Sequence, residues 1–202
     1  EPRKALSVIQ DAMAAQPDRP ELLNVAGKVF QINGDVNQAV SAYTKLASLV
    51  PTSDQPYLRL AEIHLGAKNK DTARDSLTRG LRTHPKSIAI QRALIIMDIA
   101  DNRFSEALST ARQIQRERPK ESAGYVLEGD VHVAKKSPAE AASAYKRGMQ
   151  EAPSTDLAER AYSALLLNKS TSEATALADT WLKAYPNDNT FRLFLAESAN
   201  KR

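Results

Sequence analysis

Cysteine is absent from the 202-residue sequence, and glycine and aromatic residues are scarce. There are 7 glycines, and aromatic residues make up 5% of the chain. Without cysteine there is no disulfide, no thiolate nucleophile and no cysteine-ligated zinc or iron–sulfur site. So little glycine and aromatic material argues against phosphate-binding loops, hairpins and a β-sandwich. No run approaches the roughly 18 apolar residues that a membrane-spanning helix requires.

The sequence has only a small excess of charge of one sign. The 28 basic and 24 acidic residues leave a net charge of +4, a small excess for a nucleic-acid-binding protein. The sequence begins with Glu1, and no signal-peptide pattern follows it. We therefore expect it to be part of a longer or processed chain.

Proline and alanine recur with a period of 34 residues. Two independent columns keep this spacing, and both lose one residue at the last step, which chance does not explain. The prolines are Pro17, Pro51, Pro85, Pro119, Pro153 and Pro186, and the alanines are Ala5, Ala39, Ala73, Ala107, Ala141 and Ala174.

The segments between these markers have the periodicity of amphipathic helices. Each helix that contains a periodic alanine is predicted to end at the following proline, which cannot continue a helix. The pattern predicts five helix pairs, preceded by a lone second helix and followed by a lone first helix, twelve helices in one array. The predicted units are 1–19, 20–53, 54–87, 88–121, 122–155, 156–188 and 189–202.

Helix starts carry capping signals. Asp35 is followed three residues later by Gln38, which predicts a reciprocal capping box. Ser137 and Ser170, each followed three residues later by a glutamate, are predicted to cap in the same way.

The 34-residue unit, with its aromatic, small, alanine and terminal-proline columns, resembles the tetratricopeptide repeat. Segment 22–51 carries nearly the whole pattern, including Gly27, Phe30, Ala39, Tyr43 and Pro51. The resemblance implies an all-α fold, an α-solenoid that follows a right-handed superhelix and whose first helices line a concave binding groove. Departures from the usual columns, which indicate altered local packing, are Leu46, Asp98, Ile114, Glu128, Glu159 and Trp181.

Segment 123–153 looks like the large repeat lipoproteins associated with PEP-CTERM exosortase and exopolysaccharide systems of Gram-negative bacteria. This resemblance implies a role in exopolysaccharide or surface-protein export and a periplasmic or outer-membrane-associated location, with a cytoplasmic location as the alternative. The residues that carry it are Gly124, Tyr125, Leu127, Glu128, Gly129 and Asp130.

No catalytic motif is present, so we expect no enzyme, no cofactor and no metal site. His64 and His132 lie two repeats apart, too far to share a metal, and His84 precedes a repeat proline. His64, Asp98 and His132 occupy one column, which allows two interpretations. They form a hydrogen-bonded rung between units, or Asp98 turns to the groove edge and is hydrated.

The concave groove is the predicted site, and its partner is a protein or peptide. Its middle is apolar, with acidic positions at Glu62 and Asp130, which favours a peptide with apolar anchors and some basic residues. Lys28 and Arg92 resemble part of the carboxylate clamp of some family members, but Glu62 between them disfavours it. Alternatively, several of the apolar side chains pack between adjacent first helices. The predicted groove residues are Asn24, Lys28, Leu58, Glu62, Leu65, Arg92, Ile96, Ile99, Val126, Asp130, Val133 and Arg160, flanked by Gln31, Ala164 and Leu167.

Cations recur near the ends of the second helices, where they complement the helix dipole by about 0.3–1 kcal/mol each. We interpret them as a solvated convex face and expect no nucleic acid. The alternative is an RNA-binding helical repeat that uses this basic convex face. The cations are Lys45, Arg79, Arg112, Lys146 and Arg147.

The two ends of the array are expected to expose apolar side chains, because each lacks its partner helix. Exposed apolar ends favour end-to-end self-association. The residues concerned are Ala5, Ile9 and Ala12 at one end and Phe191, Phe194 and Leu195 at the other.

Overall fold

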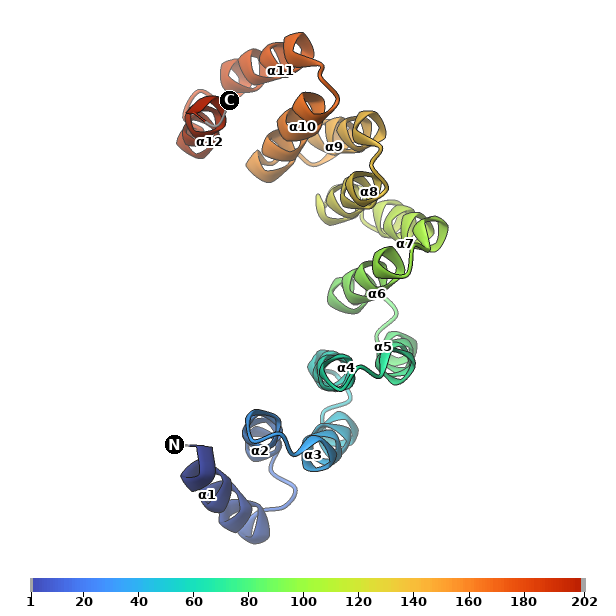
Figure 1. Cartoon of the computed structure of the whole chain (residues 1–202), viewed down its shortest axis with the longest axis vertical. Helices are drawn as coiled ribbons and strands as arrows, with labels where there is room; N and C mark the ends of the chain where they lie inside the picture. The colour runs from blue at the N-terminus through green and yellow to red at the C-terminus, as the bar shows by residue number, and fades with distance from the viewer. Residues whose placement is uncertain (1, 201–202) are drawn as a thin grey trace. The chain divides into compact units, whose positions relative to one another are not determined.

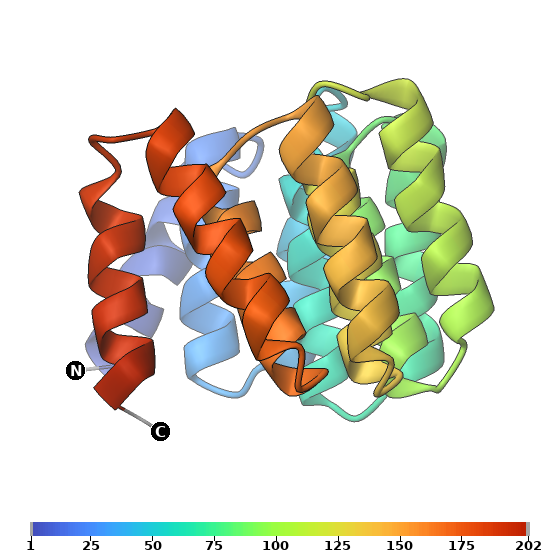
Figure 2. The same ribbon diagram turned by 90° about the horizontal axis from the view of Figure 1, so that it is seen from above.

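The protein is an all-α helical repeat, as the periodicity predicts. The computed structural model describes residues 2–200, and this part of the chain contains twelve α-helices and no strand. Consecutive helices run side by side in opposite directions (Figure 2). The helices are α1 (Pro2–Ala15), α2 (Pro20–Ile32), α3 (Val36–Leu49), α4 (Gln55–Gly66), α5 (Lys70–Thr83), α6 (Ile88–Ala100), α7 (Phe104–Glu117), α8 (Ala123–Ala134), α9 (Pro138–Glu151), α10 (Thr155–Leu167), α11 (Thr171–Ala184) and α12 (Asn189–Asn200).

The helices, labelled in Figure 1, fall into two compact units. The units are Glu1–Leu94 and Ile95–Arg202, so the boundary lies inside α6. The core of the N-terminal unit centres on Leu23, Phe30 and Tyr43. The C-terminal unit has one cluster around Tyr145 and a second around Trp181. The division of the chain into seven repeat segments, and the superhelical path, stay predictions.

Within a pair, the two helices approach closely because a glycine of the first helix faces a tyrosine ring of the second. A Cβ atom on Gly27 would lie 2.4 Å from Cε2 of Tyr43, and one on Gly129 would lie 2.1 Å from Cε1 of Tyr145. Neither distance is compatible with a side chain at the glycine position. The small column of the first helices therefore fixes the distance between the helices of these two pairs.

Residue size in one column is compensated by residue size in another. Gly80 leaves room for Tyr57, because a Cβ atom on the glycine would lie 2.7 Å from Cβ of the tyrosine. Leu46 stands one repeat before Gly80 but has a large side chain. The residue one repeat before Tyr57 is Leu23, which is smaller than tyrosine. Leu23 and Leu46 belong to the same core cluster. The departure at Leu46 is therefore matched by a smaller partner on the first helix.

The turn inside each pair requires a left-handed residue. Gly34 has φ +79°, and the periodic counterparts of Gly34 are not glycines but also have positive φ. The following backbone N–H closes a Schellman-type bond, as from Asp35 to the Phe30 carbonyl at 2.9 Å. The counterparts are Lys68, Asn102, Lys136 and Lys169, with φ between 58° and 61°.

The structure confirms one of the three predicted N-cap residues and contradicts the other two. Asp35 accepts a hydrogen bond from the Gln38 backbone N–H at 3.3 Å, which confirms that cap. Ser137 and Ser170 make no side-chain cap bond, so those predictions are wrong. Ser154, whose backbone is extended, does cap its helix through the Leu157 N–H. Ser87 caps α6 in the same way, through the Ile90 N–H at 3.2 Å.

The expected exposure of the chain ends is wrong at two positions. Ile9 is buried against the core of the N-terminal unit. Phe191 is buried with Ala158 and Trp181, and it packs edge-on against Trp181. Of the remaining end residues, Ala5 is exposed and Ala12, Phe194 and Leu195 are half-buried. Within residues 2–200, every helix is too short or too polar to cross a membrane.

We predict that Lys136→Gly raises the free energy of unfolding by about 0.5–1 kcal/mol, because glycine adopts positive φ without a steric penalty. The control is Lys135→Gly, one residue earlier, where φ is −73°. There, glycine only adds freedom to the unfolded chain and should lower stability by a similar amount. Urea unfolding measures both values. If the two variants shift stability in the same direction, the left-handed residue is not strained.

Candidate peptide groove

Five predicted groove residues of the C-terminal unit meet in one hollow between α8 and α10. It has a volume of about 330 Å³. The five are Asp130, Val133, Arg160, Ala164 and Leu167, and the hollow is also lined by Tyr145, Asp156, Glu159, Ser163 and Phe194. We call it the α8–α10 hollow.

The polar centre of the α8–α10 hollow is a hydrogen-bonded network around Asp130. Tyr145 Oη donates to Asp130 Oδ1 at 2.6 Å, and Arg160 Nη1 donates to the same oxygen at 2.7 Å. Arg160 Nε donates to Asp156 Oδ1 at 2.7 Å. Burial, followed by the hydrogen bond to Asp130, raises the pKa of Tyr145, so the phenol stays protonated and remains a donor. Arg160 is therefore held between two carboxylates.

The α8–α10 hollow carries more negative than positive charge. Asp130, Asp156 and Glu159 face a single guanidinium, that of Arg160. Burial raises the pKa of Glu159, and the charges of Asp156 and Asp188 raise it further. The charge of Arg160 lowers the pKa of Glu159 but does not outweigh these effects, so Glu159 is incompletely balanced.

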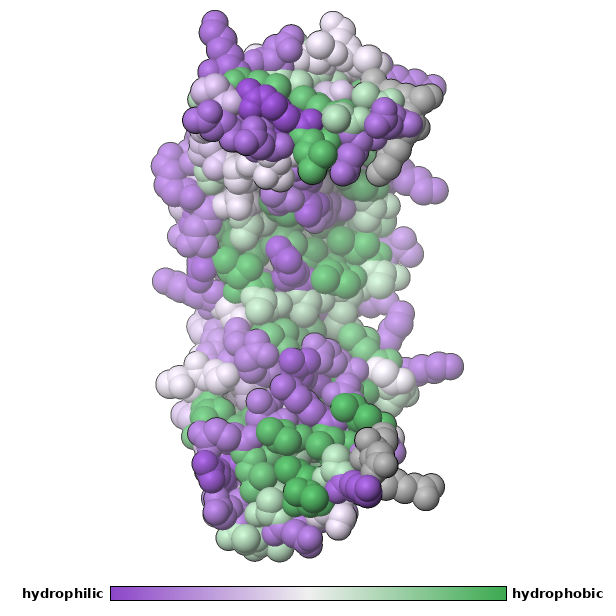
Figure 3. Space-filling view, turned by 90° about the vertical axis from the view of Figure 1, so that its left-hand side faces the viewer, coloured by the Kyte–Doolittle hydropathy of each residue, from purple (hydrophilic) through white to green (hydrophobic). Residues whose placement is uncertain are grey.

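Exposed apolar side chains flank this charge. The Leu167 residue is 63% exposed, and Val133 is also exposed. In the upper part of Figure 3, where the C-terminal unit lies, hydrophobic and hydrophilic areas adjoin one another. The hollow thus offers carboxylates beside apolar contact area.

In the N-terminal unit, the predicted acidic position is already paired. Glu62 Oε2 lies 2.7 Å from Arg59 Nη1, an ion pair that the sequence did not reveal. Leu65 and Lys28 are exposed, and Leu58 and Asn24 are half-buried. The exposed predicted residues of this unit are therefore mainly polar, and Arg92 and Gln31 are also exposed.

Val126 does not belong to an exposed apolar track. It is 4% exposed and packs in the core cluster with Tyr145 and Leu157. The prediction of Val126 as a groove residue is wrong, because Val126 lies on the side of α8 that packs against its neighbouring helices. The alternative, packing between helices, is correct for this residue. In the same unit, Ile96 is exposed and Ile99 is half-buried.

Asp98 forms an ion pair that the sequence did not predict. Its carboxylate is buried, which excludes the hydrated position, and Oδ1 lies 3.2 Å from Arg103 Nη2. The predicted rung with His132 is not supported. The Nδ1 atom of His132 is buried without a hydrogen-bond partner. Within residues 2–200, no group of histidine and acidic side chains has the arrangement of a metal site.

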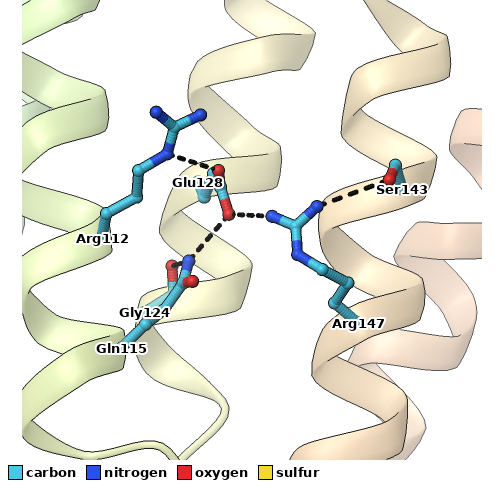
Figure 4. A network of polar contacts seen from close by, with 6 residues as sticks. All are labelled: Arg112, Gln115, Gly124, Glu128, Ser143 and Arg147. Carbon is cyan, nitrogen blue, oxygen red and sulfur yellow. Dashed lines mark hydrogen bonds and ion pairs between the residues drawn. The ribbon is translucent and has the colours of Figure 1, made fainter.

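Sequence reasoning missed a network around Glu128 on the second-helix side (Figure 4). The Glu128 side chain is 2% exposed. Its Oε1 accepts from Arg112 Nε at 2.9 Å, and its Oε2 accepts from Gln115 Nε2 at 2.8 Å and from Arg147 Nη2. The only signal was that Glu128 departs from an apolar column.

Most of the second-helix cations are engaged by carboxylates. Lys45 lies 2.6 Å from Asp18, and Lys146 lies 3.2 Å from Glu173. With Arg112 and Arg147 on Glu128, four of the five cations predicted to be solvated are ion-paired. Because four of these five cations are ion-paired, they do not form the continuous track of unpaired cations that the RNA-binding alternative requires.

Comparisons with known proteins identify the repeat. Two family models, each described as tetratricopeptide repeat, match residues 32–95 and 98–156, together more than half of the chain. The chain belongs to the tetratricopeptide-repeat family. No curated protein sequence matches it.

Several solved structures share the fold. PilW, described as a widely conserved type IV pilus biogenesis factor, is 14% identical with a TM-score of 0.60, over 96% of this chain and 90% of that one. MamA is 20% identical with a TM-score of 0.55, over 72% and 85%. A thermophilic tetratricopeptide-repeat protein of Thermus thermophilus is 16% identical with a TM-score of 0.57, over 90% and 99%.

We predict that Glu128→Gln lowers the stability of this tetratricopeptide-repeat protein by about 1.5–3 kcal/mol at pH 7, because it leaves two guanidinium groups without their counter-charge. Burial alone would raise the pKa of Glu128, but the hydrogen bonds from Gln115 and Arg112 and the charge of Arg147 outweigh burial and lower it.

The pH dependence follows from that direction. A lowered pKa stabilises the folded state fully above the ordinary value of 4.5, and this stabilisation is lost as pH falls through the folded-state pKa. The stability gap between wild type and Glu128→Gln should therefore narrow below about pH 4.5. Urea unfolding at pH 7, 5 and 3.5 measures it, with the exposed Glu140→Gln as control. A gap that is constant with pH would contradict the assignment.

Proposed function

We propose that the chain is a non-enzymatic interaction scaffold that binds a peptide with basic residues and apolar anchors in the α8–α10 hollow. The observation that carries the proposal is the juxtaposition of unbalanced carboxylates with exposed Val133 and Leu167. An extended surface on stacked repeats is the usual binding mode of such folds.

The charges explain why a cation should bind there. Arg160 already bonds Asp130 and Asp156, so Glu159 is the carboxylate that its acidic neighbours still repel. A lysine or arginine of the partner would relieve that repulsion. The cation would approach a network whose orientation Tyr145 already fixes, which reduces the entropy lost on binding.

The apolar residues supply most of the contact area. Leu167 lies on α10 and Val133 on α8, and both line the hollow that contains the charged centre. An apolar side chain of the peptide that contacts Leu167 removes area from water at about 25 cal/mol per Å². Charge then selects the partner and sets its orientation.

The finer part of the proposal concerns cellular role. We place the protein in bacterial exopolysaccharide or surface-protein export, periplasmic or outer-membrane-associated, on the strength of the lipoprotein resemblance of segment 123–153. The likeness to PilW is one of fold only. A lipoprotein signal with a lipid-accepting cysteine, at the N-terminus of the full-length protein, would support this location, and a leaderless full-length protein would favour the cytoplasm. End-to-end self-association remains part of the proposal, through exposed residues such as Val8 and Leu193.

We predict that Leu167→Arg weakens peptide binding at least tenfold, about 1.4 kcal/mol or more, because it removes an anchor and adds a charge that repels a basic ligand. Peptides are selected from a random library against the wild type, and their dissociation constants are measured by calorimetry. The control is Leu193→Arg on α12, which introduces the same charge at a residue that is 62% exposed and lies outside the hollow.

The selected peptides should be rich in lysine or arginine next to leucine, isoleucine or phenylalanine. Circular dichroism should show the same helical spectrum for both variants. Acidic peptides, or equal weakening by Leu167→Arg and Leu193→Arg, would count against the α8–α10 hollow as the site.

A further inference from the structure

A second hollow lies on the other side of α8, between α7 and α9. It has a volume of about 670 Å³, within the size range of ligand sites. We call it the α7–α9 hollow. It is lined by Arg112, Gln115, Arg116, Tyr125, Glu128, His132, Glu140, Ser143 and Arg147.

The floor of the α7–α9 hollow holds two arginines in fixed positions. Buried Glu128 bonds Arg112 from α7 and Arg147 from α9, which approach it from opposite sides (Figure 4). Arg112 uses only Nε for this bond, and its terminal nitrogens point away from the carboxylate in Figure 4. Both side chains are about half exposed, 54% for Arg112 and 50% for Arg147. Each guanidinium has five N–H donors, so most donors of this pair remain open to a ligand.

Two further residues of the hollow have unused capacity. Arg116, in the last turn of α7, is exposed and makes no ion pair within the described part of the chain. The His132 side chain is about nine-tenths buried, and its Nδ1 atom has no hydrogen-bond partner. A buried polar atom without a partner is costly, by about 1–3 kcal/mol, unless a ligand or solvent satisfies it.

The local charge is positive. Three arginines face two carboxylates, and one of those carboxylates, Glu128, is already surrounded by donors. Burial lowers the pKa of His132, so it adds no charge at pH 7. The positive charge therefore resides on the outward-facing guanidinium edges, where it can bind a planar carboxylate in bidentate fashion.

The surrounding surface favours a short acidic ligand over a long polyanion. Lys120 pairs with Glu151 at 2.9 Å, and Lys146 pairs with Glu173 at 3.2 Å. Arg118 pairs with Glu121. Because these three neighbouring cations are ion-paired, they do not extend the positive charge of the hollow into the track that a nucleic-acid backbone needs.

We propose that the α7–α9 hollow binds an acidic segment of a protein partner, with a glutamate or aspartate carboxylate between Arg112, Arg116 and Arg147. This site is independent of the α8–α10 hollow and selects the opposite charge. A carboxylate bound there lies in the hollow that His132 also lines. A tetratricopeptide array with both sites could hold a basic and an acidic segment on opposite sides of α8.

The test uses the 202-residue chain and a fluorescein-labelled peptide with four consecutive glutamates between glycine–serine ends, capped at both termini. Fluorescence anisotropy at about 50 mM salt should show saturable binding that weakens as salt is raised. A peptide with glutamines in place of the glutamates is the ligand control and should bind at least tenfold more weakly.

The decisive variant is Arg116→Glu, because Arg116 does not contact Glu128 and its loss leaves the buried network intact. It should weaken the binding of the acidic peptide at least tenfold. Its matched control is Arg82→Glu, at the same position one repeat earlier, in the last turn of α5. That variant changes net charge equally but lies outside the hollow, and it should change affinity less than twofold. Equal weakening by both variants would mean that the peptide senses only overall charge and would overturn the proposal.

Nitrogen NMR of the imidazoles gives a second readout that a nonspecific charge effect would not move. Adding the glutamate peptide should shift the His132 side-chain resonances and leave those of His64 and His84 unchanged. Absence of a His132 shift at saturation would place the bound peptide outside the α7–α9 hollow and would overturn the proposal. A 12-nucleotide single-stranded RNA that binds more tightly than the peptide, with the same loss in Arg116→Glu, would replace the acidic segment with a nucleic acid.

Discussion

The close approach of a glycine on one helix and a tyrosine ring on the next is the constraint on which the rest of this structure depends. Gly27 lies under Tyr43, and Gly129 lies under Tyr145, with no room for a Cβ atom at either glycine. The ring fills the space that a side chain would otherwise occupy, and it is buried in both cases. Packing at this density fixes the distance and rotation of the two helices, because even one added methyl group must displace the ring.

This packing constraint also builds the candidate site. A tyrosine that crosses above the glycine carries its hydroxyl to the far side of the first helix. In the C-terminal unit the hydroxyl of Tyr145 reaches Asp130, the residue next to the glycine, at 2.6 Å. Asp130 in turn orients Arg160. In the N-terminal unit the Tyr43 hydroxyl lies 3.5 Å from the Asn24 carbonyl. A core residue thus supplies a polar atom to the proposed binding surface.

The sequence predicts the fold better than the sites, and particular residues show why. Helix number and small columns depend on spacing along one helix, which is a local property. Glu128 is bonded by residues 13, 16 and 19 positions away on neighbouring helices, so its partners depend on how those helices rotate against one another. Its departure from an apolar column marked it as unusual but did not name Arg112 or Arg147. The family layout predicted Val126 as a groove residue, but its burial depends on how α10 packs against α8.

Burying the charge of Glu128 costs desolvation free energy that packing alone does not offset. A buried ion pair is often no more stabilising than apolar residues of the same volume, because both charges lose their hydration. The pair at Glu128 avoids part of this cost, since Arg112 and Arg147 stay half exposed and keep water on their outer edges. The result is two guanidinium groups with restricted motion and open donors. An apolar residue at position 128 would fill the same space but would leave both arginines mobile, and a ligand would then have to order them on binding. Retaining the carboxylate is therefore better explained by the fixed positions of the arginines than by stability alone.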